Sequence, residues 1–184
     1  MDFSDSSREA EVRAEARAWL EENFPRWQRE HPDAGRYHLE RARSWHRRLH
    51  EGGWAAPSWP PEFGGRGFGA AEAMVWDQER ARVGADIPFN VPGFGMAGPT
   101  IAFHGTEEQK GRFLPPLLRG DEMWCQLFSE PGAGSDLAAL TTRAVRDGGE
   151  WVVPGRRSGA PARTRPTGGS CWHVPISTSP STEA

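Results

Sequence analysis

The sequence predicts a mainly α protein: a helical domain over residues 1–120, an incomplete β segment over 121–153 and a disordered tail over 154–184. Three observations indicate this division. Apolar residues recur at helical spacing in the first part, and a short apolar run followed by a two-glycine turn marks the second. The third part has four arginines and hardly any apolar periodicity. With 184 residues, the chain has room for one domain with a hydrophobic core.

The first helix is predicted to begin after Ser6, because Glu9 stands three residues later and completes a capping box. The helix is charged, and one apolar stripe follows it: Val12, Ala16, Trp19, Leu20 and Phe24.

A second helix is predicted over residues 37–51, with the Gly52-Gly53 pair as a left-handed cap at its end. Its apolar side consists of Leu39, Ala42, Trp45 and Leu49. Proline and glycine interrupt every periodic pattern between residues 53 and 69, so no regular structure is expected there.

A third helix is predicted over residues 70–83. Residues 84–94 are expected to be irregular, and a short apolar helix is expected over residues 95–103.

A further helix is predicted to begin at the capping box of Thr106 and Gln109 and to run to about residue 118. Pro115 and Pro116 are expected to distort or end its regular part. Its apolar residues are Phe113, Leu114, Leu117 and Leu118.

The pattern changes after Gly120. Residues 123–129 are typical of a short buried strand. Residues 141–146 and 150–153 are predicted to pair as a β-hairpin, because the Asp147-Gly148-Gly149 segment between them tolerates positive φ.

Composition excludes several classes of partner. The net charge is −3 and the isoelectric point about 6.1, so nucleic acid and anionic membranes are not expected to bind. The sequence has no membrane-spanning apolar run and no signal peptide, so the protein is expected to be soluble and cytoplasmic. Cys125 and Cys171 suggest neither a disulfide framework nor a metal site. Cys125 is expected to be a buried apolar residue.

The segment from Glu130 to Asp136, EPGAGSD, is the main candidate site. It follows a predicted strand, and Gly132 and Gly134 allow backbone N–H groups to approach a ligand closely. Ser129 and Ser135 add hydroxyl groups, which suits a phosphate or the polar edge of a flavin. The G-x-G-x-x-G dinucleotide pattern is absent. Since most glycine-rich turns after strands are only turns, residue chemistry alone leaves the function open.

Three segments together carry a resemblance to the acyl-CoA dehydrogenase family. Residues 126–138, QLFSEPGAGSDLA, match the signature at the start of the family's middle β domain. Residues 54–67 are similar to the loop between early helices of the family, and residues 96–115 to the end of its N-terminal helical domain. The segments follow the family's order and spacing, so the chain is identified as a member.

The resemblance implies FAD as cofactor and an acyl-CoA thioester as substrate. Gln126, Phe128 and Ser129 match family positions at the pyrimidine side of the flavin. Ser135 matches the position that binds the cofactor's phosphates and approaches the thioester ligand. Gly134, like Gly132, keeps the turn thin for these contacts.

The resemblance also implies that Glu130 and Asp136 shape the turn and are not catalytic. The family's reaction removes the α-proton of the thioester with a carboxylate base while the β-hydride passes to the flavin. In the family this base comes from a C-terminal helical domain that the sequence lacks, so no catalytic residue is assigned. The homo-oligomeric assembly of the family is not expected for this chain.

The tail suggests a hypothesis. Codons can be chosen from Arg157 onward for which a shifted reading frame resembles the family's next β segment, including a Trp-Ser pair missing here. The chain is therefore expected to be a truncated acyl-CoA dehydrogenase that is inactive by itself. The alternatives are a non-catalytic frameshift or pseudogene product and a short binding subunit that uses the helical domain alone.

Two other features favour structural roles. His104 stands beside a glycine near a helix end, where a lone histidine is more often structural than a ligand or base. Four tryptophans are more consistent with core and loop packing than with a stacking platform: Trp45, Trp54, Trp59 and Trp76.

Overall fold

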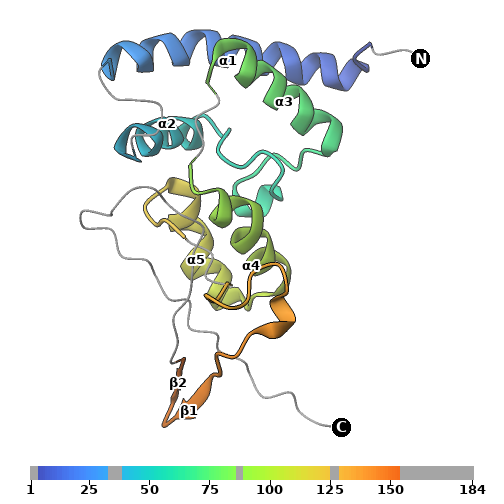
Figure 1. Ribbon diagram of the computed structural model, residues 1–184. Coiled ribbons are helices and arrows are strands. Elements are labelled where there is room, and N and C mark those ends of the chain that lie inside the picture. Colours follow the sequence, from blue (N-terminus) through green and yellow to red (C-terminus); the bar gives the residue numbers. More distant parts are fainter. Residues whose placement is uncertain (1–3, 33–38, 86–88, 125–128, 154–184) are drawn as a thin grey trace. The chain divides into compact units, whose positions relative to one another are not determined.

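The structure, a computed structural model, describes residues 4–32, 39–85, 89–124 and 129–153 (Figure 1). The chain divides into two compact units, Met1–Met123 and Trp124–Ala184. The elements of the first unit are α1 (Ser7–Glu30), α2 (Leu39–Glu51), η1 (Pro61–Phe63), α3 (Ala70–Val83), η2 (Gly93–Ala97), α4 (Gly98–His104) and α5 (Glu107–Arg119). Those of the second are η3 (Leu137–Ala139), β1 (Val145–Asp147) and β2 (Glu150–Val152). The predicted mainly α fold is confirmed.

Helix α1 begins at the predicted capping box. The Glu9 N–H donates to Ser6 Oγ at 3.3 Å, and the Ser6 N–H donates to Glu9 Oε2 at 2.8 Å. The apolar stripe faces the core as predicted, with Trp19 partly buried. Trp27 lies one turn beyond and is also buried. The fully enclosed members of the stripe are Val12, Ala16, Leu20 and Phe24.

Helix α2 ends at glycine as the sequence predicts. Gly53 has a φ of 71°, and the next N–H, that of Trp54, donates to the Leu49 carbonyl at 2.7 Å. Together with the bond from the Gly53 N–H to the His50 carbonyl, this forms a Schellman motif. Helices α3 and α5 end in the same way at Gly84 and Gly120.

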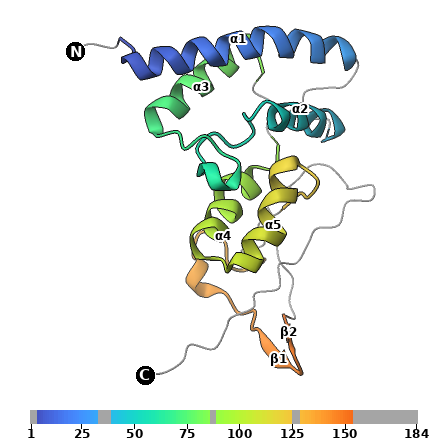
Figure 2. The ribbon, with the colours of Figure 1, turned by 180° about the vertical axis from the view of Figure 1, so that it is seen from behind.

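Helices α1 and α3 lie side by side (Figure 2). Aromatic rings pack around them. Trp54 and Trp76 stack with ring centroids 4.4 Å apart. Trp45 packs against Trp19 and Trp27, and Trp59 is buried as well. The prediction that these tryptophans serve packing is confirmed.

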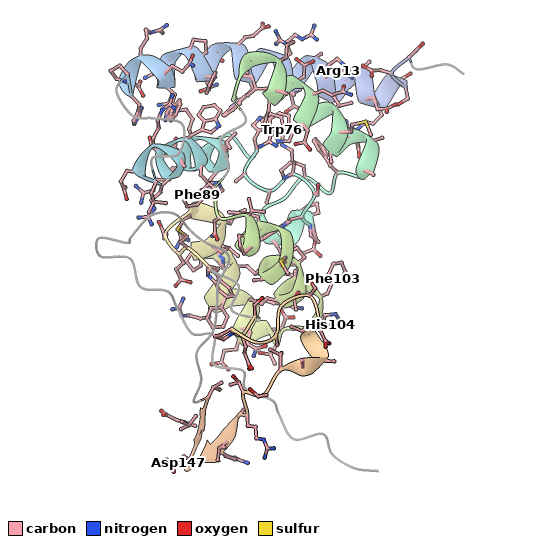
Figure 3. The ribbon with its side chains drawn as sticks, in the orientation of Figure 1. Arg13, Trp76, Phe89, Phe103, His104 and Asp147 are labelled. Atoms are coloured by element: carbon pink, nitrogen blue, oxygen red, sulfur yellow. The ribbon has the colours of Figure 1, made fainter. Side chains whose placement is uncertain are left out.

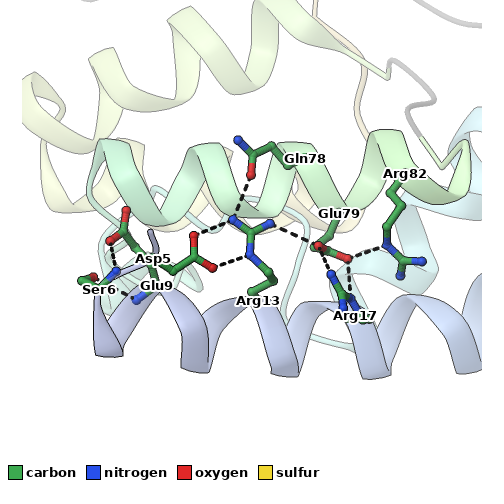
Figure 4. A network of polar contacts seen from close by, with 8 residues as sticks. All are labelled: Asp5, Ser6, Glu9, Arg13, Arg17, Gln78, Glu79 and Arg82. Atoms are coloured by element: carbon green, nitrogen blue, oxygen red, sulfur yellow. Dashed lines mark hydrogen bonds and ion pairs between the residues drawn. The ribbon is translucent and has the colours of Figure 1, made fainter. Parts of the chain in front are cut away.

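A buried ion cluster joins α1 to α3 (Figure 4). Glu79 of α3 is only 2% exposed, and its carboxylate accepts hydrogen bonds from three arginines. Arg17 donates at 2.9 and 3.1 Å, Arg82 at 2.7 Å and Arg13 at 3.2 Å. Arg13 also pairs with Asp5. The hydrogen bonds from Arg17, followed by those from Arg82 and Arg13, lower the pKa of Glu79 to about 2.

The helical path before α4 begins earlier than the sequence indicates. Val91 and Pro92 are already helical, and the π-helical turn η2 continues into α4. The predicted helix over 95–103 is confirmed, but the irregular structure predicted through residue 94 is wrong from Val91 onward. Proline resembles a helix breaker in sequence, yet at a helix start its missing N–H has no intrahelical partner to lose.

Helix α5 ends within one residue of the predicted end at about residue 118, but the two prolines do not end its regular part. It continues through Pro115 and Pro116 to Arg119. An interior proline costs about 3 kcal/mol in an isolated helix. Burial of Leu114, Leu117 and Leu118, each worth roughly 1.5–3 kcal/mol, offsets that cost.

The second unit contains the predicted hairpin, but its first strand begins at Val145 and not at residue 141 as predicted. Strands β1 and β2 pair antiparallel, with Val145 opposite Val152 and Asp147 opposite Glu150. Gly148 takes the positive φ, 59°, that the two-residue turn needs. The strand predicted over residues 123–129 falls mostly outside the described residues, and the tail of residues 154–184 lies entirely outside them.

Candidate functional site

The glycine-rich segment forms a tight turn closed by two backbone hydrogen bonds. The Glu130 N–H donates to the Ala133 carbonyl at 2.9 Å, and the Ala133 N–H donates back at 3.1 Å. Ala133 is buried, whereas Gly132, Gly134 and Ser135 are exposed. The turn therefore presents its glycine-rich side outward.

Neither conformation nor packing within the described chain requires glycine at positions 132 and 134. Neither residue has a left-handed φ, and no atom lies within 4 Å of the place where a Cβ would stand. Gly98 differs, because a Cβ there would collide with the Trp59 ring. The space over Gly132 and Gly134 is open, which fits close approach of a bound group to the backbone.

The structure brings three of the five predicted cofactor residues into one segment. Ser129 is half-buried at the start of the turn, and Gly134 and Ser135 are exposed at its end. Among the described residues, no hydrogen bond occupies the N–H groups of Gly134 and Ser135. Gln126 and Phe128 lie outside the described residues, as does Cys125.

Glu130 is the most constrained carboxylate of the segment. It is 8% exposed and accepts hydrogen bonds from Thr141 N, Thr141 Oγ1 and Thr142 N at 2.8–2.9 Å. Hydrogen bonds from Thr142 and Thr141 lower the pKa of Glu130 to about 2. The sequence assigned a shaping role to Glu130 without showing its partners, because the two threonines stand eleven and twelve residues away.

Asp136 behaves differently. Its side chain is exposed, and its backbone carbonyl accepts a hydrogen bond from the Ala139 N–H at 3.3 Å, next to η3. The described contact of Asp136 is therefore made by its backbone, and its side chain is exposed to solvent.

A groove of about 410 Å³ lies in the helical unit, between the loop around η1 and α5. Phe63, Leu114 and Leu118 form part of its apolar lining. Of its cationic side chains, Lys110 pairs with Glu107 at 2.9 Å, and Arg119 pairs with Asp121 at 2.7 Å. Both cations are thus paired with acidic side chains, and the contacts described here do not indicate a ligand for the groove.

His104 lies exposed at the end of α4, next to Phe103 (Figure 3). Within the described ranges, no three histidine, cysteine or acidic side chains gather as a metal site would require. Nor does any helix described here have the length and apolarity needed to cross a membrane.

Comparison with known proteins identifies a family model and several relatives that match this chain. The family model described as "Acyl-CoA dehydrogenase, N-terminal domain" matches residues 6–121. Acyl-CoA dehydrogenase IpdE1 of Mycobacterium tuberculosis is 42% identical over 154 residues, which is 80% of this chain and 40% of IpdE1. Acyl-CoA dehydrogenase FadE34 of the same organism is 47% identical over 123 residues, which is 67% of this chain and 17% of FadE34. The chain thus spans at most two fifths of these relatives.

Several solved structures also resemble this chain. The ChsE4–ChsE5 complex from Mycobacterium tuberculosis matches with a TM-score of 0.66 and 36% identity, over 84% of this chain and 39% of that chain. The Tcur3481–Tcur3483 steroid ACAD matches with a TM-score of 0.65 and 39% identity, over 84% and 40%. A glutaryl-CoA dehydrogenase from Mycobacterium smegmatis, solved with FADH2, shares the fold at 24% identity and a TM-score of 0.57, over 82% and 38%.

Proposed function

The chain belongs to the acyl-CoA dehydrogenase family, and on that premise we propose that it forms the N-terminal helical domain and the flavin-facing turn of an FAD-dependent enzyme. Such an enzyme introduces an α,β double bond into acyl-CoA thioesters. We divide the chain into the helical domain over residues 1–120, the first strands of a β domain over 121–153, and the tail over 154–184.

The observation that supports the FAD site is the open side of the turn. At Gly132 and Gly134 no atom lies within 4 Å of the place where a Cβ would stand, and neither φ is left-handed. The chain's own packing therefore leaves the choice of glycine unexplained. Unlike the equally open Gly149, these two glycines lie in the segment that resembles the family's signature, where a bound group close to the backbone would account for them.

The residues of the turn are assigned the following roles in chain order. Gln126, Phe128 and Ser129 hold the flavin's polar edge, and Gly134 and Ser135 hold the phosphates through exposed N–H groups. Ser135 also contacts the acyl-CoA thioester. FAD supplies the hydride acceptor when bound. The protein's part is to bind and orient, and Glu130, the buried carboxylate of the turn, lacks the properties of the α-proton base.

Glu130 is a poor candidate for the α-proton base. Its carboxylate is occupied by Thr141 and Thr142, and its pKa of about 2 makes it a weak proton acceptor near neutral pH. We therefore propose that Glu130 is not the α-proton base. From the family resemblance we also propose that residues 1–184 do not catalyse desaturation by themselves and do not form the family's oligomer.

A short binding subunit is one alternative, and a non-catalytic frameshift or pseudogene product is the other. Sequencing the gene beyond codon 153 tests it. A family-like sequence in a shifted reading frame there would favour a frameshift, and the absence of such a frame would contradict it.

The substrate class is proposed from the relatives. The Tcur3481–Tcur3483 protein, 39% identical over 84% of this chain, is a steroid ACAD. We propose a steroid-derived acyl-CoA as the substrate of the enzyme to which this part belongs. Calorimetric titration of the chain with a steroid acyl-CoA and with butyryl-CoA tests this; equal or stronger binding of butyryl-CoA contradicts it.

The flavin site is tested with two matched glycines. Flavin absorbance of the purified chain is expected to be low, and added FAD is expected to bind weakly. Gly134→Val fills the open space over the turn, so it should weaken FAD binding at least tenfold. Gly149→Val is the control, because Gly149 of the hairpin is equally open and also lacks a left-handed φ.

Equal loss of binding in both variants, or unchanged binding in Gly134→Val, would argue against the site. Stoichiometric FAD on the purified chain would contradict the expectation that the chain by itself binds FAD weakly.

A further inference from the structure

A side-chain clasp closes the loop that carries the candidate flavin turn. Glu130 stands before the turn, and Thr141 and Thr142 stand after it. The Glu130 carboxylate receives the Thr141 N–H at 2.9 Å, the Thr141 hydroxyl at 2.9 Å and the Thr142 N–H at 2.8 Å. The same residue binds Ala133 through its backbone N–H and carbonyl. One residue therefore ties both ends of the loop.

The loop between these ends has little internal support of its own. From Pro131 to Leu140 its residues are mostly exposed, with Ala133 the buried exception. The backbone bonds described there are those of the turn itself and of η3, at 3.3 Å from Ala139 and Leu140. The position of its exposed N–H groups therefore depends on how its ends are held.

We propose that Glu130 is a positioning residue, which fixes the exposed amides of Gly134 and Ser135 by clasping Thr141 and Thr142. This inference rests on the proposed FAD site for its functional meaning. The clasp itself is a property of the chain without any ligand.

The chemistry requires a carboxylate at position 130. Three donors converge on its two oxygens, and an ionised carboxylate is acceptor-only. Glutamine would turn an NH₂ group toward one of the donors and lose that bond. Thr141 donates through both its backbone and its hydroxyl, so Thr141→Val removes one bond and Thr141→Ser restores it.

The test is hydrogen–deuterium exchange of the full chain, resolved at residues 129–142. In Glu130→Gln, exchange at the N–H groups that are bonded in the wild-type loop, those of Thr141, Thr142 and Ala133, should accelerate at least tenfold. Thr141→Val should accelerate it less, and Thr141→Ser should return it to the wild-type rate. Glu150→Gln on the exposed strand β2 is the control for loss of one carboxylate and should change nothing in the loop.

Helix melting, followed by circular dichroism, should be the same in all variants, since the clasp lies in the second unit and the long helices in the first. Unchanged exchange at Ala133 and Thr142 in Glu130→Gln would overturn the proposal, as would equal acceleration in Glu150→Gln.

A separate arm distinguishes this inference from the proposed function. FAD is added to wild type, and protection of Gly134 and Ser135 is measured. Protection by FAD in wild type and its loss in Glu130→Gln supports both ideas. Faster loop exchange in Glu130→Gln without any effect of FAD on wild type supports the clasp and contradicts the flavin site.

Discussion

At the residue scale, Glu79 shows how a buried charge is accommodated. A carboxylate withdrawn from water is costly unless it is paired and hydrogen-bonded, and Glu79 has three arginines around it. Because Arg17 and Arg82 are 47% and 41% exposed, water screens part of each attraction. The cluster therefore connects α1 to α3 through buried, charged hydrogen bonds.

Glu79→Gln should therefore destabilise the helical unit by about 2–3 kcal/mol, because three cations lose their shared partner. Urea unfolding followed by circular dichroism measures this. Glu107→Gln removes a carboxylate that is 89% exposed and paired with Lys110, and it should change stability by about 0.5 kcal/mol or less. A similar loss in both variants would contradict the special role of the buried cluster.

His46 makes the stability of the helical unit depend on pH. Burial lowers its pKa from 6.5 to about 4, although its hydrogen bond to the Leu118 carbonyl, at 2.8 Å, opposes the shift. The ring also packs against Phe89 and Phe94. The folded state thus binds fewer protons than the unfolded state between these two values.

The contribution of His46 is therefore complete above pH 6.5 and lost as the pH falls toward 4. A shift of this size corresponds to about 3 kcal/mol. Urea midpoints at about pH 7, 6, 5 and 4 should decline in wild type and decline less in His46→Gln. Glu79, whose pKa falls from 4.5 to about 2, adds a further loss only below pH 4.5. Parallel curves for the two proteins would contradict the assignment to His46.

At the element scale, the π turn and α4 depend on Trp59. The Trp59 indole N–H donates to the Phe94 carbonyl at 3.2 Å, and its ring occupies the place where a side chain at Gly98 would stand. A glycine at position 98, the first residue of α4, is required by close packing, in contrast to Gly95 of the π turn, which has open space.

Gly98→Ala should therefore lower the free energy of unfolding by about 1–3 kcal/mol through overpacking. Gly95→Ala should leave it unchanged or raise it by about 0.5–1 kcal/mol, since alanine reduces the freedom of the unfolded chain. Thermal unfolding of the two variants measures the difference. A stable Gly98→Ala variant would show that the ring of Trp59 moves aside easily.

The elements themselves were predictable to different degrees. The bounds of α3 and the start of α1 follow from local signals, namely glycine caps and a capping box. The end of α5 near residue 118 was predicted, but its regular continuation through Pro115 and Pro116 was not, because burial of its leucines outweighs the local cost of proline. The early start of the helix at Val91 was missed because Pro92 resembles a breaker.

At the scale of the whole molecule, the helical unit has exposed apolar side chains as well as a closed core. Phe103 of α4 is 76% exposed, and Val91 and Met96 on the same helical path are also exposed. Exposed apolar groups of this kind favour association or aggregation when nothing covers them. The tryptophan core around Trp54 and Trp76 is independent of this surface.

The sequence by itself determined the family, the mainly α fold and the location of the candidate turn. These properties follow from local patterns: apolar spacing, caps and the EPGAGSD segment. Only the tertiary structure decided which partners the carboxylates have. Glu79 meets Arg13 and Arg17 across two helices, and Glu130 meets Thr141 across a loop. Such pairs are close in space because the chain folds, and no local pattern encodes a distance between residues far apart in sequence.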